Sequence, residues 1–251
     1  MNSVAFDANP DIWDMMNLLW GKTLGVTLQH HNGRGYCGYC CDLLNSYNTT
    51  FREDSKRKDA IRLWGANGES IIVDKAIIGE DTISKVEKYA RQYRSIGNVL
   101  PLPNALNSPH TGRASFKGMG DYFVNYLAFV KWHYPSDENQ KDEPVFKLNL
   151  DDKGKDYFSK FESYHDYIEK NLLQPFFRDP EDRKYKTIKR LDFRKLLCGE
   201  ELMNKFIDQS LLIIKERERM IISSIEEVIG KEHCSKTCEL LEKLNNYLCE
   251  M

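Results

Sequence analysis

The chain has 251 residues, of which 41% are hydrophobic and 29% are charged. These proportions are typical of a globular protein with a buried core, and they exclude a chain that is disordered throughout. The 36 basic and 38 acidic residues leave a formal net charge of -2, which argues against a protein that wraps nucleic acid over its whole surface. A local basic patch is compatible with this balance.

The N-terminal residues contain neither a basic segment nor an apolar one, so we expect no secretory signal. The longest apolar runs, such as residues 211–214, are too short to cross a bilayer. The 7 cysteines fit no regular disulfide framework and are typical of reduced thiols in the interior of an intracellular protein. We therefore expect a cytoplasmic protein that has no membrane partner.

In the first part of the chain we expect one short helix followed by strands. Pro10 follows a turn-forming asparagine and precedes an apolar stretch that ends at residue 20. This pattern predicts a helix with Pro10 at its first position. The glycine-rich stretch 21–39, with alternating apolar residues at 24–28, predicts short strands and tight turns. Residues 70–73 predict a further strand.

Helices dominate the rest of the chain. Apolar side chains recur at three- and four-residue spacing, which is typical of amphipathic helices, and the second expected helix is apolar nearly all round, as in a central core helix. The expected helices span residues 81–93, 122–132, 157–173, 200–229 and 236–248. Residues 215–219 form a charged block in the fourth.

These patterns predict an α+β fold that is mostly α-helical, with a small antiparallel β portion near the N-terminus. We expect a single domain over residues 1–251. Its β-containing part would span about 1–80 and its helical part about 81–251.

A long segment rich in Gly, Pro, Asn and basic residues separates the first two of the helices expected after residue 80. Long irregular loops within a compact domain are often functional. Between positions 94 and 117, cations alternate with amides and hydroxyls, which suits the binding of a phosphate group; the alternative is a solvated loop that caps the flanking helices. The residues expected at such a site are Tyr93, Arg94, Asn98, Asn104, His110, Arg113 and Lys117.

Cys37 and Cys40 form a CxxC pair after two adjacent histidines, and these residue types bind zinc. A closed site would need further ligands from His233, Cys234 or Cys238, whose spacing matches no standard zinc site. The alternative is a set of free thiols on short strands. We therefore predict no metal and no cofactor, and Cys37 and Cys40 stay as the weak metal candidates.

Short motifs along the chain resemble an uncharacterised bacterial family known only as a domain of unknown function. They are FD-x-NPD at 6–11, LLWGK-x-L at 18–24, YRSIGNVLPLPN at 93–104, Gly112-Arg113, GDYF at 120–123, LDF at 191–193 and the helix containing 214–219. The resemblance covers most of the chain and implies no activity. It points to the IGN-containing segment and to the downstream arginine, and the family pattern carries no cysteine pair at 37–40.

Because no catalytic motif is complete, we expect a binding or regulatory protein that contacts a protein or nucleic-acid partner through the 94–117 loop, in a setting of bacterial or phage defence. The alternative is a phosphate-handling hydrolase or nuclease that uses His110, Arg113 and Asp121. Whether the chain is an enzyme stays open. A third alternative is a protein that forms oligomers through its C-terminal helices.

Overall fold

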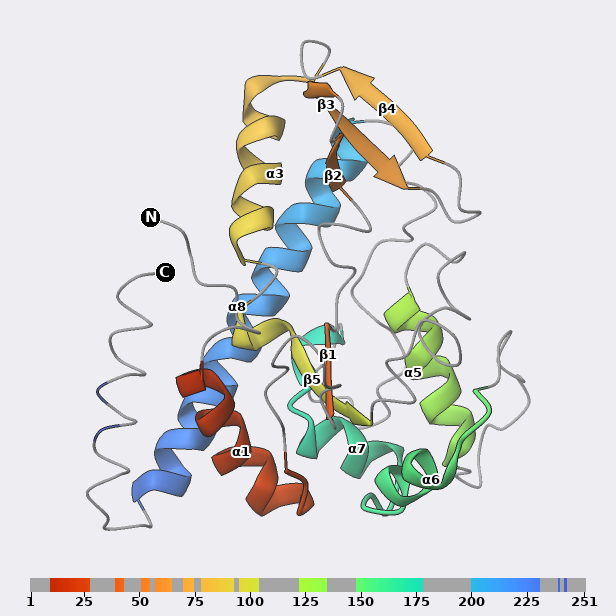
Figure 1. The fold of residues 1–251 in the computed structure, drawn as a ribbon, viewed down its shortest axis with the longest axis vertical. Coiled ribbons are helices and arrows are strands. Elements are labelled where there is room, and N and C mark those ends of the chain that lie inside the picture. Colours follow the sequence, from red (N-terminus) through yellow and green to blue (C-terminus); the bar gives the residue numbers. More distant parts are fainter. Residues whose placement is uncertain are drawn as a thin grey trace.

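A computed structural model describes residues 10–27, 39–42, 51–54, 57–64, 70–74, 78–92, 95–103, 122–134, 148–177 and 200–230, together with Glu239 and Glu242. This part of the chain is mostly helical, which confirms the helical character predicted from the sequence (Figure 1). None of the helices described there combines the length and the apolar character needed to cross a membrane.

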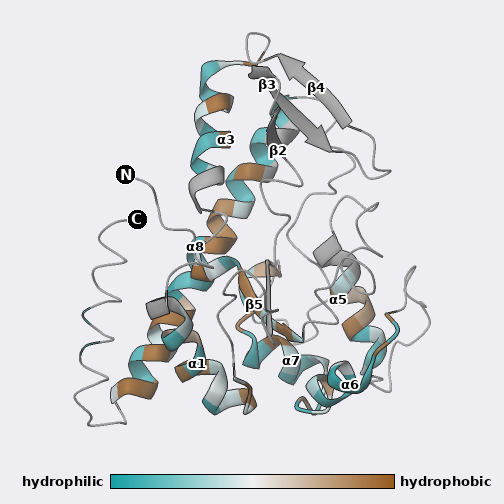
Figure 2. Ribbon diagram, in the orientation of Figure 1, coloured by the Kyte–Doolittle hydropathy of each residue, from teal (hydrophilic) through white to brown (hydrophobic). Residues whose placement is uncertain are grey.

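Helix α8, Glu200–Gly230, is the axis on which other elements pack. Figure 1 shows α3, Glu80–Gln92, beside its N-terminal half and α1, Pro10–Leu24, beside its C-terminal half. Figure 2 marks hydrophobic residues on α1 and α8 where these two helices lie together. Of the apolar face predicted at Leu202, Phe206, Leu211 and Ile214, Ile214 is buried and Leu211 is partly buried, and the other two side chains lie outside the described residues. The buried apolar residues of α8 are Ile207, Ile213, Ile214, Ile221, Ile222, Ile225 and Ile229.

Helix α1 begins at Pro10, as predicted, but it continues through Leu24. The strand expected at 24–28 is therefore wrong in its first part, and residues 25–27 have no regular structure. The next residue, Gly25, terminates the helix: its φ of 63° lies in the left-handed region, and its N–H donates to the Gly21 carbonyl at 3.1 Å. Glycine reaches this conformation without a steric penalty, which makes it a common residue just after a helix.

The described strands pair in two antiparallel sets. Strands β2, Phe51–Asp54, β3, Arg57–Trp64, and β4, Ser70–Asp74, lie in that order, with Ile61 of β3 between Glu53 and Val73. The strand predicted at 70–73 is confirmed. Strand β1, Tyr39–Asp42, pairs with the much later β5, Val99–Pro103, so that Asp42 lies opposite Val99.

Helix α5, Tyr122–His133, confirms the predicted core helix and buries Tyr126, Leu127, Phe129 and Val130. The single helix expected over 157–173 is wrong. The chain forms two short helices instead, α6, Asp152–Phe158, and α7, Tyr164–Lys170. Of the final helix expected at 236–248, only Glu239 and Glu242 lie within the described residues, and both are helical.

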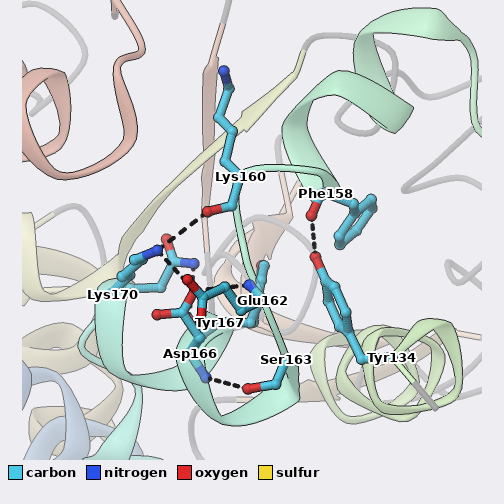
Figure 3. A network of polar contacts seen from close by, with 9 residues as sticks. Tyr134, Phe158, Lys160, Glu162, Ser163, Asp166, Tyr167 and Lys170 are labelled. Atoms are coloured by element: carbon cyan, nitrogen blue, oxygen red, sulfur yellow. Dashed lines mark hydrogen bonds and ion pairs between the residues drawn. The ribbon is translucent and has the colours of Figure 1, made fainter.

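The break between α6 and α7 follows from local capping. The Ser163 hydroxyl accepts a hydrogen bond from the Asp166 N–H at 3.1 Å, and the Asp166 carboxylate accepts one from the Glu162 N–H at 2.9 Å (Figure 3). Lys170 then bonds to the same carboxylate at 2.7 Å. A Ser three residues before an Asp is a signal that starts a helix, and here it interrupts the aromatic periodicity that predicted one continuous helix.

Candidate functional site

Most of the residues predicted to form a site lie outside the described residues, namely Tyr93, Arg94, Asn104, His110, Arg113 and Lys117, as does Asp121. Cys37 and the C-terminal His233, Cys234 and Cys238 also lie outside them. For Cys40 the structure describes the main chain in β1 but not the side chain. In the part of the chain that is described, no group of three or more His, Cys, Asp or Glu residues comes together as a metal site.

The first part of the predicted loop is regular and buried, so the loop interpretation of 96–103 is wrong. Residues Ile96–Asn98 form the 3-10 turn η2, and β5 follows at once with all five of its residues buried. The Asn98 side chain is fully buried, and its N–H donates to the Ser95 carbonyl at 2.9 Å. Asn98 thus belongs to the protein interior and does not lie on an exposed contact surface.

Gly97 is required where η2 meets α8. A Cβ atom at this position would lie 2.1 Å from the Ile214 carbonyl oxygen and 3.1 Å from the Glu218 Cβ. Helix main chain cannot yield by such an amount, so only glycine permits this close approach. The IGN motif is therefore a packing contact between a turn and a helix.

Arg217 of α8 also bonds to the turn. Its Nη1 donates to the Gly97 carbonyl at 2.8 Å, its Nη2 to the Asn171 carbonyl at 3.0 Å, and its Nε to the Leu172 carbonyl at 3.0 Å. We call these four residues the Arg217 clamp. Asn171 caps the C-terminal end of α7, where carbonyls lack helical partners and the helix dipole favours a cation.

The guanidinium of Arg217 is fully buried, and its carbon lies 5.9 Å from the centre of the Trp20 ring. Burial lowers the pKa of Arg217 to about 9, whereas the nearby Tyr167 and Tyr157 act to raise it. The side chain therefore stays charged at neutral pH. Because its donors are directed at main-chain oxygens, Arg217 connects three segments of the fold rather than offering a free anion site.

Buried phenols lie next to the clamp. The hydroxyls of Tyr126 and Tyr167 are 2.8 Å apart, and the ring of Tyr157 packs edge-on against that of Tyr167. Burial raises the pKa of both Tyr157 and Tyr167 well above the ordinary value, so both remain neutral. The Asn171 Nδ2 donates to the Tyr167 carbonyl at 3.0 Å, which links the phenols to the end of α7.

Glu218 is the second ionisable residue that α8 buries, with 6% of its surface exposed. Burial raises the pKa of Glu218 to about 7, while Lys215, one turn earlier, acts in the opposite direction. Its Oε1 is buried and accepts no hydrogen bond from the described residues. A carboxyl in this environment changes its charge near neutral pH.

Arg217 and Glu218 were not predicted as buried residues, because residues 215–219 were interpreted together as one charged block. Helical spacing contained the missing signal. Positions 217 and 218 lie three and four residues after the buried Ile214 and three or four before Ile221, so both fall on the apolar face.

Comparisons with known proteins add no assignment, since a scan against family models and searches of curated proteins and solved structures found no match. The family resemblance of the short motifs therefore stays a prediction from the sequence.

Proposed function

We propose that the chain is a binding or regulatory protein whose partner, a nucleic acid or another protein, contacts the 94–117 segment at positions outside the buried run 95–103. The observation that carries this proposal is the anchoring of the segment. Its first part is fixed by η2, β5 and the Arg217 clamp, and α5 follows soon after its end.

Both ends of the stretch 104–121 meet elements of the core. On the N-terminal side, β5 is buried up to Pro103. On the C-terminal side, α5 begins at Tyr122 and buries Tyr126 and Leu127 within its first turns. Binding residues often lie on segments that connect packed elements of a scaffold, and both flanking elements are packed here.

The charge of the segment favours a nucleic acid over a protein. No Asp or Glu occurs between positions 88 and 120, although acidic residues slightly outnumber basic ones in the whole chain. Over the same stretch the cations are Lys88, Arg91, Arg94, Arg113 and Lys117. Local positive charge with neighbouring amides and hydroxyls is what phosphate contacts use.

Purification of the chain under reducing conditions tests this proposal. Native mass and the ratio of absorbance at 260 and 280 nm would be recorded for the wild type and for a variant with Arg113→Ser and Lys117→Ser. We expect nucleic acid to co-purify with the wild type and to be lost from the variant. The matched control replaces Lys153 and Lys155, both exposed on α6, with serine and should behave as the wild type.

The outcomes separate the alternatives. A wild-type chain that is free of nucleic acid, with the same native mass as the variant, would contradict the nucleic-acid form of the proposal. Metal-dependent cleavage of RNA, DNA or nucleotides that is lost in the Arg113→Ser variant would replace binding by the hydrolase alternative, which uses His110, Arg113 and Asp121.

A further inference from the structure

Glu218 follows Arg217 in α8, but it has none of the bonds that stabilise its neighbour. Its side chain is 6% exposed, and its buried Oε1 accepts no hydrogen bond from the described residues. A carboxylate taken out of water without donors is unfavourable, whereas the neutral acid is tolerated in the same place.

The turn packs directly on this side chain, since a Cβ at Gly97 would lie 3.1 Å from the Glu218 Cβ. No residue of η2, Ile96–Asn98, is titratable. The turn thus lies against the Glu218 side chain and provides no compensating charge for its carboxyl.

Other charged groups near α8 are directed elsewhere. Lys215 is exposed on the same helix, and Arg217 donates to main-chain carbonyls. Helix α3 contributes Lys85, which pairs with Asp208 at 2.5 Å, and the 3-10 turn η4, Gln174–Phe176, contains no titratable residue. The remaining acidic and basic side chains described on α1 and α3 are exposed, and they are Asp14, Lys22, Glu80, Asp81, Glu87 and Lys88. The phenol of Tyr89 on α3 is buried.

We propose that Glu218 acts as a proton-operated latch on the turn η2. The neutral carboxyl keeps residues 96–103 packed on α8, and the ionised carboxyl favours an open form in which it reaches water. Burial raises the pKa of Glu218 to about 7, so both forms of the carboxyl are populated near neutral pH.

The latch has a consequence for the proposed binding segment. Strand β5 follows η2 without a gap and ends at Pro103, directly before the rest of the proposed binding segment. Opening of the turn would therefore also loosen β5, and proton binding would favour the form in which β5 is packed. This last step rests on the proposed function, while the latch itself does not.

Hydrogen exchange followed by mass spectrometry tests the latch without any partner. Protection of peptides within 95–103 would be measured from pH 6 to pH 8 and corrected for the intrinsic exchange rate. With a pKa of about 7 when closed and the ordinary 4.5 when open, proton linkage gives a loss of protection of about tenfold over this range. Peptides of α5 serve as the internal reference and should not show this loss.

The variant Glu218→Gln keeps the shape of the neutral acid but cannot ionise, so its protection in 95–103 should be independent of pH. Glu226→Gln, at an exposed position of the same helix, should behave as the wild type. If Glu218→Gln fails to fold, Glu218→Met supplies the same comparison. Wild-type protection that does not change with pH, or an equal loss in the Gln variant, would overturn the latch and leave the proposed function untouched.

Discussion

Arg217 donates a hydrogen bond of 2.8 Å to the main-chain carbonyl of Gly97, although 120 positions separate the two residues. The same guanidinium reaches the end of α7 at Asn171 and Leu172. Leu172 has a φ of 53°, a backbone conformation that is unfavourable for a residue with a side chain. One buried cation thus holds together a turn, the end of a helix and the central helix α8.

Replacement of Arg217 by methionine should destabilise the fold strongly. The aliphatic part of the side chain is kept, but the carbonyls of Gly97, Asn171 and Leu172 lose their charged donor. Since each charge-assisted hydrogen bond contributes about 1.5–3 kcal/mol, and a carbonyl left unpaired adds its own penalty, we expect a loss of about 3–5 kcal/mol. Urea unfolding followed by circular dichroism measures it.

The matched control is Arg219→Met, because Arg219 lies two positions later on α8 and is exposed. We expect a change of less than about 0.5 kcal/mol there. Equal losses in the two variants would show that the clamp does not hold the fold together.

Gly97→Ala should be destabilising by about 3 kcal/mol or more, because the added methyl group collides with the Ile214 carbonyl oxygen in a helix that cannot move away. Gly21→Ala makes the same chemical change inside α1, where the nearest atom is 3.5 Å away. Alanine favours the helix, so this variant should gain about 0.5–1 kcal/mol. Thermal denaturation measures both changes, and a Gly97→Ala variant as stable as the wild type would contradict the close approach at Gly97.

The hydroxyls of Tyr126 and Tyr167 are hydrogen-bonded, so we expect the effects of removing them on stability to be coupled. Tyr126→Phe leaves the buried Tyr167 hydroxyl without this partner and should reduce stability by about 1–3 kcal/mol. The variant with both tyrosines changed to phenylalanine should lose less than the sum of the single losses. Urea unfolding of the four proteins gives the coupling energy, expected at about 0.5–3 kcal/mol; strict additivity would show that the two hydroxyls do not interact.

Glu218 makes stability depend on pH. Its pKa is about 7 in the folded chain, against an ordinary 4.5, so the folded state binds the proton more tightly than the unfolded state. The contribution of Glu218 to stability is therefore fully present below pH 4.5 and is lost as the pH rises through 7. The full difference amounts to about 3 kcal/mol. Stability of the wild type minus that of Glu218→Gln should fall between pH 4.5 and pH 8, and a flat difference would exclude the burial of an ionisable carboxyl.

The elements that sequence analysis predicted correctly are those with strong local signals. Pro10 correctly predicted the first residue of α1, and the apolar periodicity of residues 200–229 predicted α8 to within one residue of its end. The break at Ser163 was missed because aromatic residues keep helical spacing across it. The hydrogen bonds that start a new helix there are formed by the short polar side chains of Ser163 and Asp166.

The buried turn could not be predicted from its own residues. Glycine, asparagine and proline at 97–104 are typical of a loop, and nothing nearby shows that Ile214 and Arg217 would pack on them from more than a hundred positions away. Antiparallel pairing of β5 with β1 is equally non-local. The charged block at 215–219 contained a local signal in its helical spacing, but its composition is typical of a solvated surface.

Binding of labelled single-stranded RNA and DNA, measured by fluorescence anisotropy between 50 and 200 mM salt, tests the proposed function most directly. We expect the wild type to bind with an affinity that falls as salt rises. In the variant with Arg113→Ser and Lys117→Ser, binding should weaken at least about tenfold. The plot of log affinity against log salt concentration should become less steep by about 1.4, as expected for the loss of two phosphate contacts on a single strand. If the two proteins bind with equal affinity and equal salt dependence, the proposal that nucleic acid binds to the 94–117 segment is contradicted.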